Sequence, residues 1–197
     1  MSRTYAPLAS SGIVSGVGFD KPPVGDYSPV SIDDAADTVM TDFRIVRALT
    51  IQATTSMQSA NNKMIANGVR MLLVVDIHNF VIGLITASDI LGEKPVRIVQ
   101  ERGIDRTEVL VGDIMTSRER LEAVDMRDLA HARVGHVVAT LRATGRRHAL
   151  VVETDDSGRQ TVRGLFSATQ VEKQLGTSID TPEVARNFAE VGELLTR

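Results

Sequence analysis

The stretch Gly83-Leu84-Ile85-Thr86-Ala87-Ser88-Asp89 decides the fold, because a near copy, Gly164-Leu165-Phe166-Ser167-Ala168-Thr169-Gln170, follows 81 residues later. Two other pairs of segments recur in the same order, at offsets of 75 and 77 residues: Val39-Met40-Thr41 with Ile114-Met115-Thr116, and Leu73-Val74-Val75-Asp76 with Leu150-Val151-Val152-Glu153. Segments that recur in a constant order indicate one supersecondary unit used twice.

Each copy is predicted to begin with a helix. In the first copy, Met57, Ala60 and Met64 fall on one helical face, and Gly68 can end the helix. Thr54, Thr55 or Ser56 can cap its start. The apolar face of the second copy is made by Val134, Val137, Val138 and Leu141, with Gly145 as the stop.

Two strands joined by a turn come next in each copy. Residues 71–75 and 149–153 are largely apolar, so they are expected to be buried on both faces of a sheet. The return strands are predicted at 81–85 and 162–166, and a second helix begins at Thr86 or Ser167. We interpret the acidic stretch Asp155–Gly158 as a hairpin turn, because it lacks the spaced acids of a calcium-binding loop.

One such unit is too small to bury its own sheet well. The predicted fold is therefore α/β (α+β), with two tandem βαββα-type repeats packed sheet to sheet about a pseudo-two-fold axis. The predicted boundaries are a flexible acidic arm at 1–37, repeat 1 at 38–92, a linker with a short helix at 93–112, repeat 2 at 113–176 and a C-terminal helix at 177–197. The arm either packs on a partner subunit or is an unfolded end. The apolar stripe of the last helix, built from Val184, Phe188, Val191 and Leu195, docks within the chain or on a second subunit.

The composition is that of a globular protein, with 197 residues, 43% apolar residues and a net charge of −3. The sequence has no cysteine, no signal-peptide core and no apolar run long enough to span a bilayer. A soluble, cytoplasmic protein is therefore expected, with no affinity for membranes. Positive charge comes from 18 arginines and only four lysines.

The repeated motif can serve a ligand or only a helix. Gly83 allows close approach to the backbone, the Thr86 hydroxyl can bond a phosphate, and the Asp89 carboxylate can accept ribose hydroxyls. The same spacing also resembles a capping box, in which Thr86 and Asp89 do no more than start a helix, and Ser167 with Gln170 fits that pattern fully.

The repeated unit, with its Leu-x-Val-Val strand, its Gly-Leu-Ile-Thr-x-x-Asp element and its preceding Met-Thr, resembles the CBS domain. Two copies in tandem resemble a stand-alone CBS pair, or Bateman module, over roughly residues 38–175. The resemblance implies a pair of clefts between the repeats that bind AMP, ADP, ATP or S-adenosylmethionine, with no required cofactor, and a homodimer.

The resemblance also implies site residues. Asp89 is expected to bind ribose and Thr86 phosphate, with Gly83 giving access to the backbone. In the second copy Ser167 keeps the hydroxyl but Gln170 replaces the acid, so one site is expected to dominate. The basic residues before the Leu-x-Val-Val strands are Arg70 in the first copy and Arg146, Arg147 and His148 in the second. The resemblance implies that such residues reach phosphates, with Arg70, Arg147 and His148 as the candidates, although a general preference of this chain for arginine also explains them.

Other classes of function find less support in the residues. The sequence has no zinc-protease, nucleophile-elbow or P-loop motif and no set of nucleophile, base and orienting group, so no enzyme is predicted. Acidic residues balance the arginines of the second repeat, so no nucleic-acid partner is predicted. The prediction is a regulatory module that senses an adenine nucleotide and signals to an unidentified regulated protein. The alternative is a structural dimerisation module with no physiological ligand.

Overall fold

The fold is built on two four-stranded sheets, each assembled around one repeat. The structure is a computed structural model that describes residues 28–179. The first sheet has the order β2-β3-β4-β5, from strands Thr50–Gln52, Met71–Val75, Val81–Thr86 and Thr116–Ser117. The second has the order β1-β8-β7-β6, from strands Met40–Asp42, Gln160–Ser167, His148–Thr154 and Ala123–Asp125. The predicted fold class and its two repeats are confirmed.

The sheets exchange their edge strands, which the sequence analysis did not predict. Strand β1, near the start of repeat 1, pairs antiparallel with β8 of repeat 2, and β5, near the start of repeat 2, pairs antiparallel with β4 of repeat 1. The two recurring Met-Thr segments therefore each complete the sheet of the opposite repeat. This exchange ties the repeats together through backbone hydrogen bonds.

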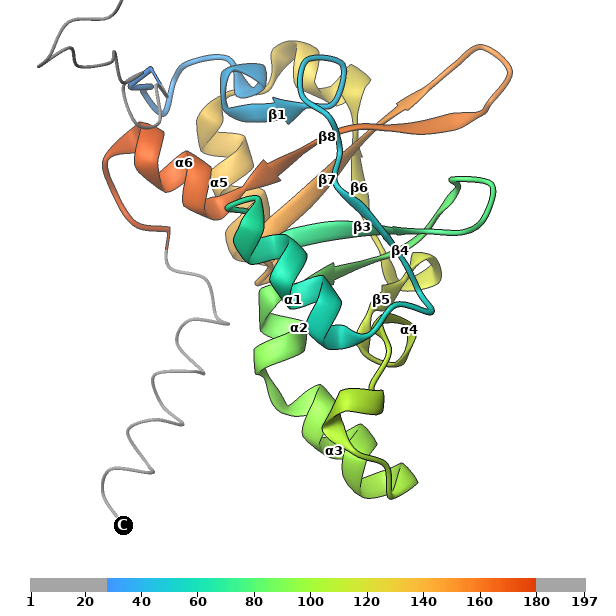
Figure 1. Cartoon of the computed structure of the whole chain (residues 1–197). Helices are drawn as coiled ribbons and strands as arrows, with labels where there is room; N and C mark the ends of the chain where they lie inside the picture. Colours follow the sequence, from blue (N-terminus) through green and yellow to red (C-terminus); the bar gives the residue numbers. More distant parts are fainter. Residues whose placement is uncertain (1–27, 180–197) are drawn as a thin grey trace, which may run out of the picture.

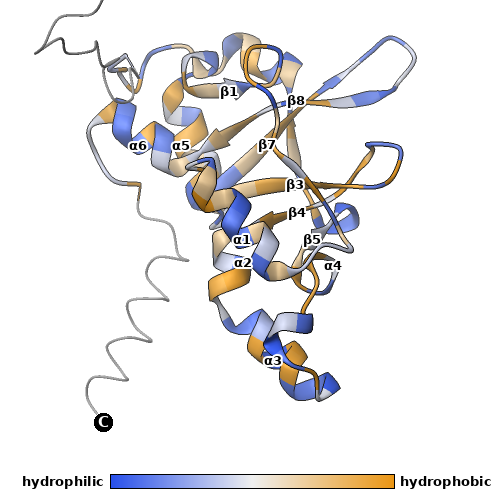
Figure 2. Cartoon of the chain, in the orientation of Figure 1, coloured by the Kyte–Doolittle hydropathy of each residue, from blue (hydrophilic) through white to orange (hydrophobic). Residues whose placement is uncertain are grey.

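Helices cover the outer face of each sheet and leave the hairpins free (Figure 1). Repeat 1 carries α1 (Met57–Ala66), α2 (Ala87–Leu91), α3 (Glu93–Arg102) and α4 (Val111–Ile114). Repeat 2 carries α5 (Val134–Thr144) and α6 (Ala168–Leu175), and short 3-10 turns lie at Ala36–Val39, Arg106–Glu108, Arg118–Arg120 and Met126–His131. The β3–β4 and β7–β8 hairpins project away from the helices, and Figure 2 shows that the tip of the β7–β8 hairpin is hydrophilic.

The predicted helix and strand patterns are largely confirmed. Met57, Ala60 and Met64 are all buried on one face of α1, and Ser56 caps that helix through its side chain. Strand β3 is buried throughout, whereas in β7 only Leu150 and Val151 are buried. The prediction of a fully buried second-copy strand was therefore wrong, because β7 extends into an exposed hairpin.

Three apolar clusters form the core. One lies between the first sheet and its helices, a second between the second sheet and its helices. The third cluster joins the two sheets through Met71, Leu73, Leu150 and Leu165. This central cluster is the sheet-to-sheet contact that the size of one repeat requires.

Part of the predicted arm is packed. The Val30 N–H donates to the Gln174 carbonyl over 3.0 Å, and Ala36 is completely buried against repeat 2. Residues 28–37 are therefore attached to repeat 2 by backbone hydrogen bonds and by the buried Ala36, although most of them are exposed. Residues 1–27 and the predicted helix with its apolar stripe lie outside the described residues.

Candidate functional site: two clefts between the repeats

Two clefts open between the repeats. Cleft 1 has a volume of about 490 Å³ and takes residues from α2, β5, β7 and α6. Cleft 2 has a volume of about 350 Å³ and takes residues from β1, α6 and the chain before β2 and β3. Both volumes are within the range of small-molecule sites.

The two clefts are equivalent versions of one site. Thr116 and Leu121 in cleft 1 match Thr41 and Val46 in cleft 2 at the 75-residue offset. At the other offsets Arg147 matches Arg70, and the acid Asp89 matches Gln170. Three residues, Arg70, His148 and Thr169, line both clefts, so the two spaces meet at these side chains.

Asp89 lies on the repeat 1 wall of cleft 1, where its carboxylate already has partners. Its Oδ2 accepts hydrogen bonds from the backbone N–H and the hydroxyl of Thr86, each over 2.8 Å, and the Thr86 hydroxyl accepts from the Asp89 N–H over 3.2 Å. The other oxygen, Oδ1, is 2.5 Å from Lys94 Nζ. The predicted capping box is thus present, and a ribose would have to share this carboxylate with Lys94.

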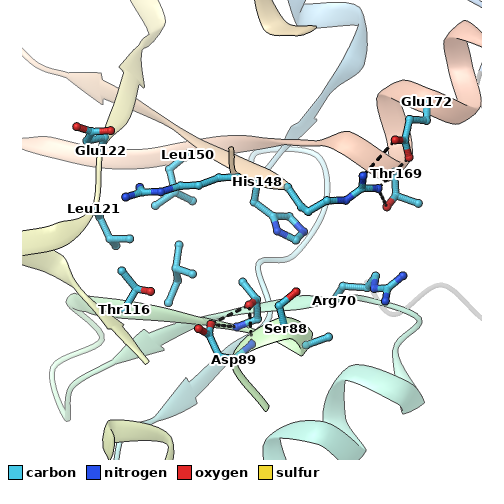
Figure 3. Close-up of a pocket in the computed structure, with 15 residues that line it drawn as sticks. Arg70, Ser88, Asp89, Thr116, Leu121, Glu122, His148, Leu150, Thr169 and Glu172 are labelled. Carbon is cyan, nitrogen blue, oxygen red and sulfur yellow. Dashed lines mark hydrogen bonds and ion pairs between the residues drawn. The ribbon is translucent and has the colours of Figure 1, made fainter. Parts of the chain in front are cut away.

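The helix that follows is short. Helix α2 has five residues, so its dipole adds little to the attraction of an anion. Any preference of cleft 1 for a phosphate therefore depends on charged side chains. Arg70 comes from the wall of repeat 1 that also holds Asp89 (Figure 3), and Arg146 and Arg147 come from the opposite wall, which belongs to repeat 2.

Arg147 is the main cation of that wall. Its guanidinium donates to both carboxylate oxygens of Glu172, over 3.1 and 2.9 Å, and to the Thr169 hydroxyl over 3.1 Å. Glu172 Oε1 also accepts the backbone N–H of Ile179 over 3.0 Å. The fork geometry of Arg147 suits a phosphate, but its carboxylate partner has to be displaced or shared.

His148 lies between the two clefts. Burial is the largest cause of the lowered pKa of its imidazole, and the positive charges of Arg147 and Arg70 lower this pKa further. Together they lower the pKa of His148 to about 4, against the weaker opposing effect of Asp89. The imidazole is therefore neutral at pH 7 and can donate or accept one hydrogen bond without adding charge.

In cleft 2 the predicted capping box of Ser167 and Gln170 is not formed. The Ser167 side chain makes no cap hydrogen bond, and Gln170 Oε1 accepts instead from the Thr41 hydroxyl over 2.7 Å. The exchanged strand β1 brings Thr41 to this position. The prediction of a complete capping box was wrong because a strand from the other repeat takes the Gln170 side chain.

Gly83 lines neither cleft. A Cβ at this position would lie 2.6 Å from the Thr116 carbonyl oxygen, so the glycine is required for the close pairing of β4 with β5. The predicted role of Gly83 in giving a ligand access to the backbone is therefore replaced by a structural role. Of the other predicted residues, Thr86, Asp89 and Arg147 line cleft 1, Ser167 and Gln170 line cleft 2, and Arg70 and His148 line both.

Apolar side chains complete both clefts. Leu84, Leu121 and Leu150 line cleft 1. Val46, Leu49 and Leu165 line cleft 2. Each cleft thus combines an apolar surface, on which a flat ring can pack, with convergent polar groups.

The sequence analysis missed several charged residues of the clefts. Lys94 and Glu172 pair with predicted site residues, and no local motif announces either contact. Arg47 and Glu122 could have been found, because they occupy equivalent positions at the 75-residue offset and have opposite charges.

Within residues 28–179, no cluster of three or more His, Cys, Asp or Glu side chains is placed to hold a metal ion. In the same part of the chain, no helix has the length and apolar character needed to cross a bilayer.

Comparison with known proteins identifies the fold. Residues 32–95 match the family model of the CBS domain. Solved structures, CBS pairs among them, cover most of the chain with TM-scores of 0.50 to 0.54. The chain has the CBS-pair fold. No curated protein matches the sequence.

Three solved structures are similar to this chain. An uncharacterized conserved protein from Pyrococcus horikoshii is 22% identical, with a TM-score of 0.54 over 77% of this chain and 99% of that one. CBSX2, from Arabidopsis thaliana, in complex with AMP is 20% identical, with a TM-score of 0.51 over 71% and 94%. The CBS pair of protein MJ0100, in complex with 5′-methylthioadenosine and S-adenosyl-L-methionine, is 18% identical, with a TM-score of 0.50 over 73% and 97%.

Proposed function

We propose that this chain is a regulatory module that binds an adenosine-containing ligand between its two CBS repeats. The observation that carries the proposal is the lining of cleft 1, which brings Arg70 and Asp89 of repeat 1 together with Arg147 and His148 of repeat 2 and with three leucines. Arginines suit a phosphate, a carboxylate suits the ribose hydroxyls, and the leucines suit an adenine ring.

The similar structures support the same class of ligand. CBSX2 was solved with AMP, and the CBS pair of MJ0100 with 5′-methylthioadenosine and S-adenosyl-L-methionine. AMP, ADP, ATP and S-adenosylmethionine are accordingly the ligands to test. No cofactor is part of the proposal.

The proposed mechanism is a shift between two arrangements of the cleft. A phosphate on Arg147 weakens its ion pair with Glu172, which also holds the Ile179 N–H. The ligand thereby changes the contacts of the chain that leaves α6. A regulated protein that contacts this region, or the second subunit of a homodimer, would respond to the change.

One observation favours the second candidate, a structural module without a ligand. The Asp89 carboxylate is occupied by Thr86 and Lys94, and its side chain is only 11% exposed. A residue whose hydrogen-bonding capacity serves helix α2 and Lys94 does not need a ligand to explain its presence.

Calorimetric titration of ligand-stripped protein with AMP, ADP, ATP and S-adenosylmethionine distinguishes the two candidates. The expected result is heat of binding with at least one of them, and the absence of heat with all four favours the structural module. The ratio of absorbance at about 260 and 280 nm reports nucleotide carried through purification, because the chain has two Tyr and no Trp.

Variants locate the site. Asp89→Ala should weaken the binding of AMP more than Gln170→Ala, because cleft 1 holds the acid. Asp89→Asn is the matched control, since it keeps an oxygen that can accept the N-cap hydrogen bond while it removes the charge. A greater loss from Gln170→Ala would move the dominant site to cleft 2.

A further inference from the structure

We infer that the two clefts select ligands by charge: cleft 2 binds a chain of two or three phosphates, whereas cleft 1 favours an adenosyl ligand with one phosphate or none. This inference rests on the proposed function for the adenosyl part of the ligand. The phosphate preference of cleft 2 stands on its own lining residues, and it can therefore be tested separately.

The lining residues of the clefts differ in charge. Cleft 2 is lined by the cations Arg47, Arg70 and Lys173, and no Asp or Glu of the described chain is among its lining residues. The charged lining residues of cleft 1 are three arginines and three acids, namely Arg70, Arg146, Arg147, Asp89, Glu122 and Glu172. His148 lines both clefts and is neutral, so it does not alter this contrast.

The contrast arises from substitutions between the repeats. Arg47 in cleft 2 corresponds to Glu122 in cleft 1 at the 75-residue offset. Gln170 in cleft 2 corresponds to Asp89 in cleft 1 at the 81-residue offset. Each of these two changes makes cleft 2 more positive than cleft 1. At two other positions the clefts agree, because Ser167 corresponds to Thr86 and Arg70 corresponds to Arg147.

The cations of cleft 2 are also free to bind. Within residues 28–179, the side chains of Arg47, Arg70 and Lys173 form no ion pair and no hydrogen bond, and all three residues are exposed. By contrast, Arg147 is held by Glu172, and the Arg146 guanidinium donates to the Arg120 carbonyl over 3.3 Å. A phosphate chain entering cleft 2 therefore displaces none of residues 28–179 from these cations.

Three cations around one concave space suit a polyphosphate. Guanidinium groups bind phosphate oxygens in pairs, and an ammonium group acts as a point charge on the same oxygens. A concave surface lined by one sign of charge also concentrates oppositely charged ligands. The acids of cleft 1 repel the same phosphates. Attraction in cleft 2 and repulsion in cleft 1 therefore both direct a phosphate chain to cleft 2.

Arg70 couples the two clefts. Because Arg70 lines both, a polyphosphate that binds it in cleft 2 withdraws a cation from cleft 1. Binding in the two clefts is therefore expected to be antagonistic for phosphate-bearing ligands.

The test uses inorganic tripolyphosphate and ATP as probes in calorimetric titrations of the full chain. Lys173→Ala, and separately Arg47→Ala, should weaken tripolyphosphate binding by about tenfold or more, which is the effect of losing one charge-assisted hydrogen bond. Both residues are exposed, and circular dichroism verifies that the variants fold. Arg146→Ala is the matched control in cleft 1 and should leave tripolyphosphate binding within about twofold, which is well below the effect of one such bond.

Each outcome bears on a separate claim. Loss with Arg146→Ala but not with the cleft 2 variants, or no binding of either probe, overturns the charge selection. Binding of tripolyphosphate that depends on Lys173, with no heat from any adenosyl ligand, supports the anion site and refutes the proposed nucleotide sensor. Binding of AMP together with no binding of tripolyphosphate leaves the sensor intact and refutes the preference of cleft 2. Equal losses of ATP and tripolyphosphate binding in Lys173→Ala would show that the phosphates alone are recognised there.

Discussion

Acidification should weaken the fold through His148. This side chain lies between Arg147 and Arg70 at the junction of the clefts, and its burial is the largest cause of the low pKa of about 4. In the unfolded chain the pKa of a histidine returns to 6.5. Between these values the unfolded state binds more protons than the folded state, so the free energy of unfolding falls as the pH falls.

The magnitude follows from the two pKa values. The contribution of His148 to the free energy of unfolding is fully present above the pKa of histidine in the unfolded chain, and it is lost progressively below that pKa. By about pH 5 the loss attributable to His148 is about 2 kcal/mol, and it approaches about 3 kcal/mol below the folded pKa. That is a large fraction of the stability of an ordinary domain.

Urea denaturation at a series of pH values, with the wild type and His148→Gln, isolates this contribution. Glutamine stays neutral, so the difference between the two curves cancels the other titrating groups. We expect the wild type to lose about 2 kcal/mol more than the variant between about pH 7.5 and 5. Parallel curves would refute the reasoning. If His148→Gln does not fold, an NMR titration of the His148 ring in the wild type gives the pKa directly, and a value near 6.5 would refute it equally.

Three other substitutions test the packing. Gly83→Ala should lower the free energy of unfolding by about 1–3 kcal/mol, because its Cβ would lie 2.6 Å from the Thr116 carbonyl oxygen; an unchanged melting temperature would mean that β5 moves freely. Leu72 is fully buried, so Leu72→Ala should lower the free energy of unfolding in urea by about 2–5 kcal/mol. Ile65 is 71% exposed, so the control Ile65→Ala should change it by less than about 0.5 kcal/mol. Equal effects of the two variants would contradict the assigned core. Thr41→Val removes the hydrogen bond to Gln170 and should lower the free energy of unfolding by about 1 kcal/mol. In a double-mutant cycle with Gln170→Leu, the two substitutions should show a coupling energy. Additive effects would show that the hydrogen bond contributes nothing.

Local patterns predicted the elements of this fold well. The spacing of Met57, Ala60 and Met64 predicts a helix face because a packed helix has to bury one stripe of side chains. The apolar run at 71–75 predicts a doubly buried strand for the same reason. The recurrence of three segments in one order was sufficient to predict two repeats.

The exchange of edge strands could not be predicted from the repeat alone. Met40 and Met115 stand near the start of their own repeats in the sequence, and nothing in a strand of two or three residues specifies which sheet it joins. The exchange is a tertiary contact, in which Met40 pairs with Phe166 and Leu84 pairs with Thr116. This tertiary contact also explains why Gly83 and Gln170 have roles that differ from the predicted ones.

The site was predicted in part. Thr86, Asp89, Arg70, Arg147 and His148 were predicted, and the structure brings them to one cleft. Their ion-pair partners were not predicted, because Lys94 and Glu172 reach them through helix geometry that no short motif encodes. The contrast in charge between the clefts required knowledge of which residues face each space.

The exchanged strands also limit how this chain can be divided. A fragment that ends within α3 keeps β4 but loses β5, so one edge of its sheet stays unpaired, and it carries β1 with no β8 to receive it. Unpaired edges promote association with other chains. Either half expressed alone should therefore aggregate or self-associate, whereas the two halves expressed together should reconstitute both sheets as complementary fragments. Any chimera with a protein of the same fold has to exchange each Met-Thr strand together with the opposite repeat.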